Sequence, residues 1–404
     1  MPDIKSHHFF APCPRGLEPV LAAELKKIGG LSIQINDGGV KFQGSWHTCY
    51  RTNLESRIAS HILWRITKKP YIDETDIYKI SHAFPWNEWI SSTHTIRVNV
   101  AAKKCPLRSL EFVTLKIKDA VCDKFRELTS KRPSVDTVNP DIRIHGFLDA
   151  REFTLYLDTS GDALFKRDLR KTTGEAPLRE NLAAGILQLS GWKPGIPLLD
   201  PMCGSGTFLL EAVQIALNIA PGIKRNFAFE KFKQFDSPLW NRMKEESISQ
   251  QKEKLQQPIY GSDLYGDALL DAQANLDLAG FLDLVALKQG NILEIPSPAP
   301  TGILITNPPY GKRVGNQDEL AELYPKIGDI LKNKFVGWSA YFLTGDALLP
   351  KSIRLSASRR IPLFNGAIEC RLLEYKIVAG GMRKVKSTVV TQNPDSAPIT
   401  SKNL

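Results

Sequence analysis

The sequence lacks the features that mark zinc-binding, secreted and membrane-spanning proteins. Its 404 residues contain six widely separated cysteines and no Cys-x-x-Cys pair. Zinc sites need clustered ligands and disulfide frameworks belong to small secreted domains, so we expect six reduced thiols and no bound metal. No apolar run approaches the roughly 18 residues that a membrane-crossing helix needs. The first residues also lack the basic start and apolar stretch of a secretion signal, which predicts a cytoplasmic protein without membrane contact.

Two common phosphate-binding signatures are missing as well. There is no Gly-Lys-Ser/Thr of a P-loop, and Leu209 stands where the dinucleotide fingerprint Gly-x-Gly-x-x-Gly has its third glycine. The charge balance, in contrast, is distinctly basic, with 53 Lys and Arg against 43 Asp and Glu. A basic excess favours polyanionic partners, because each neutralised phosphate releases condensed counterions. The composition therefore favours nucleic acid as a partner.

The first region, residues 1–164, has a mixed α+β pattern without a cluster of catalytic residue types. A helix is expected over 17–28, because apolar residues recur at helical spacing and Gly29-Gly30 is a helix stop. Further strands are expected at 33–35, 39–42 and 95–100, a helix at 115–128, and a hairpin of 142–148 with 152–158 around Asp149-Ala150-Arg151.

The second region, residues 165–379, alternates strands with helices. Strands are expected at 196–200, 258–263, 284–287 and 302–307, and helices at 208–220 and 267–279. This alternation predicts a parallel sheet covered by helices on both faces. The segment 225–257 interrupts it and is expected to form a crossover with its own helix, its aromatic residues serving packing in preference to substrate contact. The tail 380–404 lacks aromatic residues and apolar periodicity, so we expect it to be mobile.

A glycine-rich turn follows the first strand of the alternating region and predicts a ligand site. The run Asp200-Pro-Met-Cys-Gly204-Ser-Gly206-Thr207 leads from strand to helix, at the carboxyl end where open α/β sheets bind ligands. Glycine is required because a Cβ would clash with a ligand against the backbone. Asp263, after the next strand, can accept hydrogen bonds from ribose hydroxyls or cap a turn. Asn291, after the third, can pair with an adenine edge or serve a turn. Together they predict an adenosine cofactor without phosphates.

The run Asn307-Pro308-Pro309-Tyr310-Gly311 follows another buried strand and indicates chemistry on an amine. An exocyclic base nitrogen is a poor nucleophile, because its lone pair is delocalised into the ring. The Asn307 side-chain oxygen and the Pro308 carbonyl can accept its protons, and the prolines hold both oxygens in place. Tyr310 offers a face on which an extruded base can stack. We therefore predict Asn307, Pro308 and Tyr310 as the catalytic residues.

These two motifs resemble motifs I and IV of the Rossmann-like class I amino-methyltransferases. Arg-Glu-Asn-Leu-Ala-Ala at 179–184, Phe-Ala-Phe-Glu at 227–230 and Asn-Gly-Ala-Ile-Glu-Cys-Arg-Leu-Leu at 365–373 narrow the resemblance to the bacterial THUMP-domain 23S rRNA guanine-N2 methyltransferases. The resemblance covers nearly the whole chain except the tail. It implies a ferredoxin-like part at 1–45, a THUMP RNA-binding domain at 46–164 and a methyltransferase domain at 165–379. Since a second methyltransferase domain of some relatives is lacking, one modification is expected.

The resemblance also implies the ligands and their contacts. The methyl donor is S-adenosylmethionine, and the partner is RNA, 23S rRNA or a ribosomal precursor particle. The implied donor contacts are Thr173, Leu178, Glu180, Asp200, Gly204, Gly206, Thr207, Asp263 and Asn291. Two positions depart from the family pattern: Asn291 stands where Asp is common, and Lys312-Arg313 stands where Glu-Arg is frequent.

Three alternatives remain open at this point. The same amine loop serves adenine-N6 methylation and glutamine methylation of release factors, although the basic charge and the THUMP resemblance favour RNA. The RNA can be a tRNA, because THUMP methyltransferases act on tRNA and rRNA. The chain can also be an inactive RNA-binding or ribosome-assembly factor, which the intact Asp200, Gly204 and Asn307 disfavour.

Overall fold

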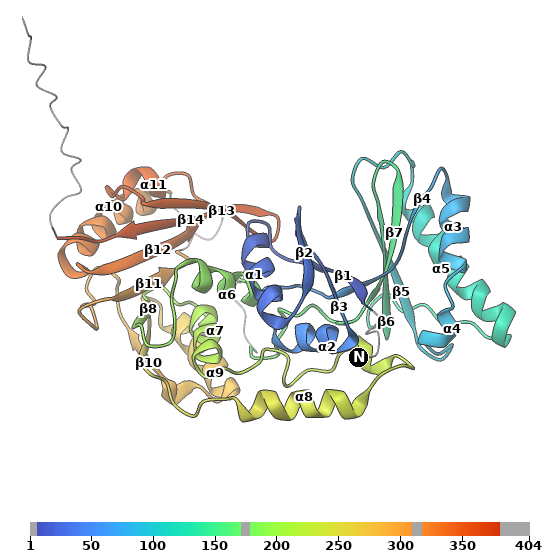
Figure 1. The fold of residues 1–404 in the computed structure, drawn as a ribbon. Coiled ribbons are helices and arrows are strands. Elements are labelled where there is room, and N and C mark those ends of the chain that lie inside the picture. The colour runs from blue at the N-terminus through green and yellow to red at the C-terminus, as the bar shows by residue number, and fades with distance from the viewer. Residues whose placement is uncertain (1–5, 171–177, 309–316, 380–404) are drawn as a thin grey trace, which may run out of the picture.

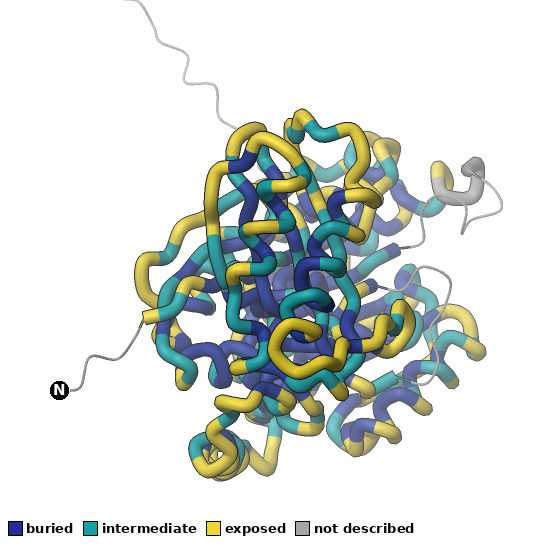
Figure 2. The backbone as a smooth tube through the Cα atoms, turned by 90° about the vertical axis from the view of Figure 1, so that its right-hand side faces the viewer, coloured by how far each residue is buried: buried dark blue, intermediate teal, exposed yellow. Residues whose placement is uncertain are grey.

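The structure is a computed structural model that describes residues 6–170, 178–308 and 317–379. Two sheets, each with its helices, lie side by side along the molecule (Figure 1). The chain builds the first sheet before residue 160 and the second after residue 197. The tail 380–404, predicted to be mobile, lies outside the described residues. Buried residues gather inside the molecule and exposed residues lie at its surface (Figure 2), and in both sheets the central strands are more buried than the edge strands.

The first sheet has seven strands in the order β2-β3-β1-β4-β7-β6-β5. Its strands are β1 (His7–Pro12), β2 (Leu31–Asn36), β3 (Gly39–Gly44), β4 (Leu63–Pro70), β5 (Ile96–Ala102), β6 (Ile142–Leu148) and β7 (Glu152–Asp158). Its helices are α1 (Glu18–Ile28), α2 (Trp46–Glu55), α3 (Glu74–His82), α4 (Trp86–Trp89) and α5 (Leu110–Thr129). Since β4 pairs with both β1 and β7, one continuous sheet crosses the predicted limit between residues 45 and 46.

The local signals at helix α1 and at the β6–β7 hairpin form the predicted structures. Gly29 adopts φ 108°, and its N–H donates to the carbonyls of Leu25 and Lys26, which ends α1. A left-handed residue at this place is the usual helix stop, and glycine adopts it without strain. In the hairpin, the Asp149 carboxylate accepts the N–H groups of Arg151 and Glu152 and closes the turn. Both sequence predictions are confirmed.

The second sheet has seven strands in the order β10-β9-β8-β11-β12-β14-β13. Its strands are β8 (Leu198–Asp200), β9 (Ile259–Asp263), β10 (Val285–Gln289), β11 (Gly302–Thr306), β12 (Trp338–Thr344), β13 (Arg359–Asn365) and β14 (Ile368–Lys376). Its helices are α6 (Glu180–Leu189), α7 (Thr207–Ala216), α8 (Ser237–Ser249), α9 (Gly266–Ala279), α10 (Gln317–Lys334) and α11 (Leu349–Ser352). The strands from β10 to β11 pair in parallel, as predicted, and β12, which was not predicted as a strand, continues the parallel order. Strands β13 and β14 form an antiparallel edge.

This sheet is buried on both faces, as the continuous apolar strands predict. Leu198, Ile303 and Ile305 pack in one core cluster with side chains of α6, α7 and α9. Leu199 and Leu304 are the next residues along the same strands after Leu198 and Ile303. They pack in a second cluster with side chains of α10 and α11. The alternation follows from the period of two along a strand. The predicted layer arrangement is therefore confirmed.

The segment 225–257 contains helix α8, and its aromatic residues serve packing. Phe227, Phe229 and Trp240 are buried, and the Phe229 ring stacks on Tyr50 of α2 with centroids 4.4 Å apart. The interpretation of these rings as core residues is confirmed. They join the second sheet's domain to the first.

Close packing and buried charges fix the junction between the two halves. A Cβ on Gly185 of α6 would come within 2.4 Å of the Leu17 side chain, so the helix and the first domain touch there. Arg57 donates to the carbonyls of Gln214, in the last turn of α7, and of Ile219, just after this helix. Arg167 makes a buried ion pair with Glu211 of α7 and donates to the Arg57 carbonyl. Because buried charges are stable only when paired, these contacts hold the halves in one arrangement.

Candidate active site

The predicted site residues gather at one edge of the second sheet. β8, β9 and β11 are parallel, and they end at Asp200, Asp263 and Thr306 on the same edge. β8 lies between the other two, with Leu199 opposite both Tyr260 and Leu304. The glycine turn after β8 therefore lies between Asp263 and Asn307, which follow the neighbouring strands. This edge is the usual ligand site of an open α/β sheet.

The glycine turn has a backbone that other residues adopt only with strain. Gly204 has φ 51° and Gly206 φ 80°, both in the left-handed region. No atom of the described residues lies within 4 Å of the place where a Cβ on Gly204 would stand, so this part of the chain leaves open space beside the residue. At Gly206 the same Cβ would approach Ala272 of α9 to 3.3 Å. One glycine thus faces a cradle, and the other lets the turn approach α9 closely.

The carboxylate of Asp263 organises this turn. Oδ2 accepts the N–H of Gly204 at 2.9 Å, and Oδ1 accepts the N–H of Tyr265 at 3.0 Å. The side chain is buried at 7% exposure. Each carboxylate oxygen can accept a further hydrogen bond, so Asp263 can hold the turn and a ligand hydroxyl together. Both readings of the sequence, turn residue and ligand contact, are compatible with this geometry.

Burial changes the acid–base properties of two residues at the turn. Burial raises the pKa of Asp200 to about 8, and the nearby charge of Asp263 adds to that effect. Burial also raises the pKa of the Cys203 thiol well above its usual range, with Asp200 and Asp263 contributing. Since the thiolate is the reactive form of cysteine, Cys203 is a packing residue and not a nucleophile.

Asn307 presents an unused hydrogen-bond acceptor at the same edge. It directly follows Thr306, the last residue of β11, and it is half-buried. Its side-chain oxygen is buried and has no hydrogen-bond partner among the described residues. A buried acceptor without a partner is costly and needs an explanation, and a hydrogen bond to a ligand would provide one here. Pro308 is buried beside it, and Tyr310 lies outside the described residues.

The segment before α6 reaches the glycine turn through an arginine. Arg170 donates to Glu180 Oε1 through Nε and Nη2, at 2.9 and 2.6 Å, and to Thr207 Oγ1 at 3.0 Å. Glu180 is the first residue of α6, and Thr207 is the first of α7. Leu178, two residues before Glu180, is buried. Arg170 thus connects Glu180 with Thr207, while Thr173 lies outside the described residues.

Asn291 lies in the turn after β10, close to the carboxyl end of β9. Its side-chain oxygen accepts the N–H of Leu293 at 3.0 Å, and the Gly290 N–H donates to the Asp263 carbonyl. Asn291 therefore serves the turn, and its amide NH₂ is the group left for a ligand. A cavity of about 290 Å³ opens here, lined by Ser262, Gly290 and Asn291 among others.

Three further contributors to this edge were missed by the sequence analysis. Arg170 has no sequence signal, because its partners are distant in the chain. Asn275 of α9 is fully buried, and its side-chain amide donates to the Ser205 carbonyl at 3.1 Å. The sequence signal that could have identified this residue is its polar side chain on an otherwise apolar face of the helix. Leu264, directly after Asp263, is 51% exposed. An exposed apolar side chain beside a ligand edge is a candidate contact.

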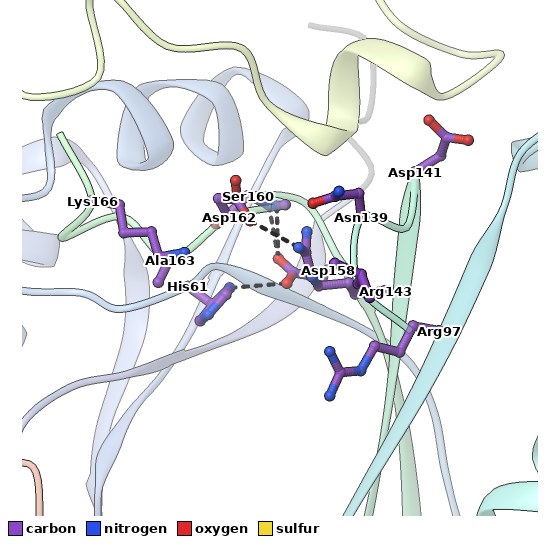
Figure 3. Close-up of polar contacts among 12 residues, drawn as sticks. His61, Arg97, Asn139, Asp141, Arg143, Asp158, Ser160, Asp162, Ala163 and Lys166 are labelled. Atoms are coloured by element: carbon purple, nitrogen blue, oxygen red, sulfur yellow. Dashed lines mark hydrogen bonds and ion pairs between the residues drawn. The ribbon is translucent and has the colours of Figure 1, made fainter. Parts of the chain in front are cut away.

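The connection between the two halves is held by its own polar contacts. Asp158 ends β7 fully buried, with His61 Nδ1 at 2.9 Å and the N–H of Ser160 donating to it (Figure 3). Burial opposes ionisation of Asp158, but the charges of His61 and His145 outweigh it and hold the pKa of this carboxyl well below its usual range. Arg143 of β6 pairs with Asp162 in the connection (Figure 3). These contacts fix the chain that leads to the candidate site.

Two kinds of feature are absent from the described ranges, 6–170, 178–308 and 317–379. They contain no group of three or more His, Cys, Asp or Glu side chains placed to hold a metal ion. None of their helices combines the length and apolar character needed to cross a membrane.

Family models match three successive parts of the chain. An RlmL ferredoxin-like domain matches residues 8–63, a THUMP domain matches residues 71–158, and an RMKL-like methyltransferase domain matches residues 167–374. A ribosomal RNA large subunit methyltransferase K/L of Aeromonas hydrophila is 39% identical over 398 residues, 94% of this chain and 55% of the relative. A candidate RNA methyltransferase of Synechocystis sp. is 37% identical over 383 residues, 93% of this chain and 100% of the relative.

Solved structures show the same fold over nearly the whole chain. A candidate methyltransferase complexed with SAH is 30% identical, with a TM-score of 0.84 over 93% of this chain and 100% of its own. A possible methylase of Clostridium difficile 630 is 27% identical, with a TM-score of 0.85 over the same shares. The chain spans about 55% of the length of the K/L methyltransferase of Aeromonas. The resemblance found in the motifs is confirmed: the chain belongs to the RMKL-like methyltransferase family, with a ferredoxin-like part and a THUMP domain before the methyltransferase domain.

Proposed function

We propose that this protein transfers a methyl group from S-adenosylmethionine to the exocyclic N2 amine of a guanine in RNA, 23S rRNA or a ribosomal precursor particle, in the cytoplasm. The observation that carries the proposal is the buried Asn307 side-chain oxygen beside the glycine turn, which has no hydrogen-bond partner among the residues that the structure describes. The THUMP domain, the names of the K/L relatives and the formal net charge of +10 support RNA as the substrate. The solved relative with SAH supports the donor.

The residues present fit such a donor. Open space borders Gly204, and the adjacent Asp263 carboxylate has remaining acceptor capacity for ribose hydroxyls. The cavity beside Asn291 is the proposed place for the adenine. Leu178, Glu180, Asp200, Gly206 and Thr207 are the further proposed contacts, with Thr173. When bound, the donor supplies an electrophilic methyl on a sulfonium.

The protein's own contribution is to orient and activate the amine. The Asn307 oxygen and the Pro308 carbonyl accept its two hydrogens, which favours the pyramidal nitrogen with its lone pair directed outward. Preorganised acceptors of this kind lower the barrier because they need no rearrangement during the reaction. Tyr310 is proposed to stack on the extruded base. Most of the acceleration then comes from alignment of nitrogen and methyl at about 3–3.5 Å.

The alternatives make different predictions for one experiment. Tritium transfer from labelled donor to separated rRNA, tRNA and protein fractions distinguishes a 23S rRNA enzyme from a tRNA enzyme or a protein methyltransferase. Mass spectrometry of rRNA nucleosides from cells lacking the protein then identifies the product. Loss of an N2-methylguanosine supports the proposal, and loss of an N6-methyladenosine contradicts it. A protein that binds no donor in calorimetric titration is an assembly factor instead.

A further inference from the structure

A second cavity, of about 440 Å³, lies next to the candidate active site. Three segments that are distant in the chain form it: the connection at 165–170, the start of α6 with Arg179 and Glu180, and the β13–β14 turn with Asn365 and Gly366. β14 runs antiparallel to β12, so its first residues lie at the edge where the parallel strands end. The cavity therefore opens at the same edge as Asn307 and the glycine turn. Arg170, which contacts Thr207, belongs to its wall.

The lining is rich in cations, two of which are left unpaired. Arg167 is paired with Glu211 and Arg170 with Glu180. Lys166 and Arg179 are exposed, and neither makes an ion pair with any residue that the structure describes. Asp168 is the only lining carboxylate without a cationic partner at ion-pair distance within the described ranges. The free side chains of the cavity thus carry an excess of positive charge, which suits an anion.

Arg179 is held in a geometry suited to a nucleotide. Its guanidinium lies over the Phe165 ring, 4.9 Å from the centroid. One Nη is 3.6 Å from the place where a Cβ on Gly366 would stand, so the glycine leaves more room beside the exposed Arg179 side chain than any other residue would. A guanidinium plane supported by an aromatic ring can stack on a base and donate to a phosphate together. Its neighbours Leu178 and Glu180 are buried, so Arg179 alone of the three turns outward.

The segment that carries Phe165 and Lys166 is anchored on both sides. Arg225 donates to the carbonyls of Asp162, Ala163 and Lys166. Asp162 is also paired with Arg143 of the THUMP domain, and Lys166 follows at the end of the same segment (Figure 3). The wall of the cavity at Phe165 and Lys166 is therefore fixed in place, and it belongs to the connection that leads from the THUMP domain to the methyltransferase domain.

We propose that this cavity binds the nucleotide that flanks the target guanine in single-stranded RNA, with its phosphate on Lys166 and Arg179 and its base stacked on the Arg179 guanidinium. This assignment rests on the proposed function. It adds the place where the RNA strand continues beside the target guanine. Asp168 opposes the phosphate and limits the affinity.

The test uses variants that remove a positive charge from the cavity, keep it in another side chain, or remove the negative charge of Asp168. Arg179→Ala and Lys166→Ala should each weaken binding of transcribed 23S rRNA about five- to tenfold in filter binding at moderate salt, and should lower the slope of log Kd against log salt by about one. Arg179→Lys keeps the positive charge but loses the planar guanidinium. Its RNA affinity should therefore lie between that of Arg179→Ala and that of the wild type. Asp168→Asn should tighten RNA binding two- to threefold. Asp168 has φ 55°, a conformation that asparagine tolerates. The matched control is Lys254→Ala, which removes an exposed lysine in the loop after α8. It should change neither the RNA affinity nor the salt slope.

Titration with S-adenosylhomocysteine separates this site from the donor site. Each variant should keep the wild-type Kd for it within twofold, and its thermal midpoint within a few degrees. A collapse of this affinity in Arg179→Ala overturns the proposal, because the cavity then belongs to the donor. The proposal is also overturned if Arg179→Ala and Lys166→Ala keep the RNA affinity and the salt slope of the wild type. This holds even if the wild-type protein transfers methyl groups to RNA. A wild-type protein that methylates only protein, or binds no RNA, overturns the proposed function together with this assignment.

Discussion

The backbone N–H of Gly204 donates a 2.9 Å hydrogen bond to Oδ2 of Asp263, which connects the turn after β8 to the end of β9. The turns that follow two neighbouring strands at the candidate site are therefore positioned by one carboxylate. The second oxygen of Asp263 accepts the Tyr265 N–H and fixes the following turn. Removal of this side chain must affect the shape of the site as well as any direct contact with a ligand.

Asp263→Ala should raise the Kd for S-adenosylhomocysteine by about 10- to 100-fold. The change removes the proposed acceptor for the ribose and the partner of the Gly204 N–H, and a lost hydrogen bond to a charged group costs about 1.5–3 kcal/mol. Asp263→Asn keeps one acceptor oxygen, so its Kd for S-adenosylhomocysteine should lie between those of the wild type and of Asp263→Ala. Calorimetric titration measures both. Unchanged donor affinity with lost turnover would assign Asp263 to the acceptor side instead.

Asn307→Ala should lose at least about 100-fold in turnover while its donor Kd stays near the wild-type value. The Asn307 oxygen is proposed to act on the amine, and removal of one preorganised group costs about 10²–10³ in rate. Single-turnover methyl transfer measures the chemical step, and titration measures donor binding. A variant with normal turnover per bound donor and collapsed donor affinity would contradict this role.

Strands β8 to β11 of the second sheet and the turns that follow them were predictable, because local signals and tertiary structure agree there. Strand β11 and Asn307, for example, follow from one apolar run and one turn motif. The antiparallel edge of β13 and β14 was not predicted as strands, because exposed and buried residues do not alternate cleanly in them. Their pairing is set by β12, a neighbour that the sequence pattern does not reveal.

Contacts between distant segments could not be read from the sequence. Arg170 contacts Glu180 and Thr207, 10 and 37 residues away. Helix α2 is also invisible in the apolar pattern, because it buries polar residues such as Thr52 and Asn53. Asn53 is satisfied by Thr159 and Ser160 from the end of β7. Such polar partners become visible only when the chain is folded.

The buried Arg167–Glu211 pair gives a prediction about stability. Arg167→Ala or Glu211→Ala should each lower the free energy of unfolding by about 3–5 kcal/mol, since either change leaves a buried charge without its partner. The double variant Arg167→Met/Glu211→Leu should lose much less than the sum of the single variants, because no buried charge is left unpaired. Urea unfolding of the four proteins measures this. Additive losses would show that the two side chains act independently.

Asp200 gives a prediction about pH. Because burial raises its pKa to about 8, the folded chain holds a proton that the unfolded chain releases near the ordinary aspartate value of about 3.9. Between these two values the folded state binds more protons than the unfolded state. Asp200 therefore makes the free energy of unfolding fall as pH rises, by up to about 1.4 kcal/mol per pH unit.

Asp200→Asn removes this dependence, because the amide does not ionise and its oxygen can still accept the Met202 N–H that Asp200 accepts. The pKa values of Glu24 and Glu211 are also raised by burial, but both residues are present in both proteins and their effects cancel in the difference. Urea unfolding without donor at pH 5, 6, 7 and 8 should show the variant gaining stability over the wild type as pH rises, with the gain levelling off above about pH 8. Parallel curves for the two proteins would mean that Asp200 is already ionised in the folded chain at pH 5, and that its burial is compensated by contacts stronger than the Met202 hydrogen bond.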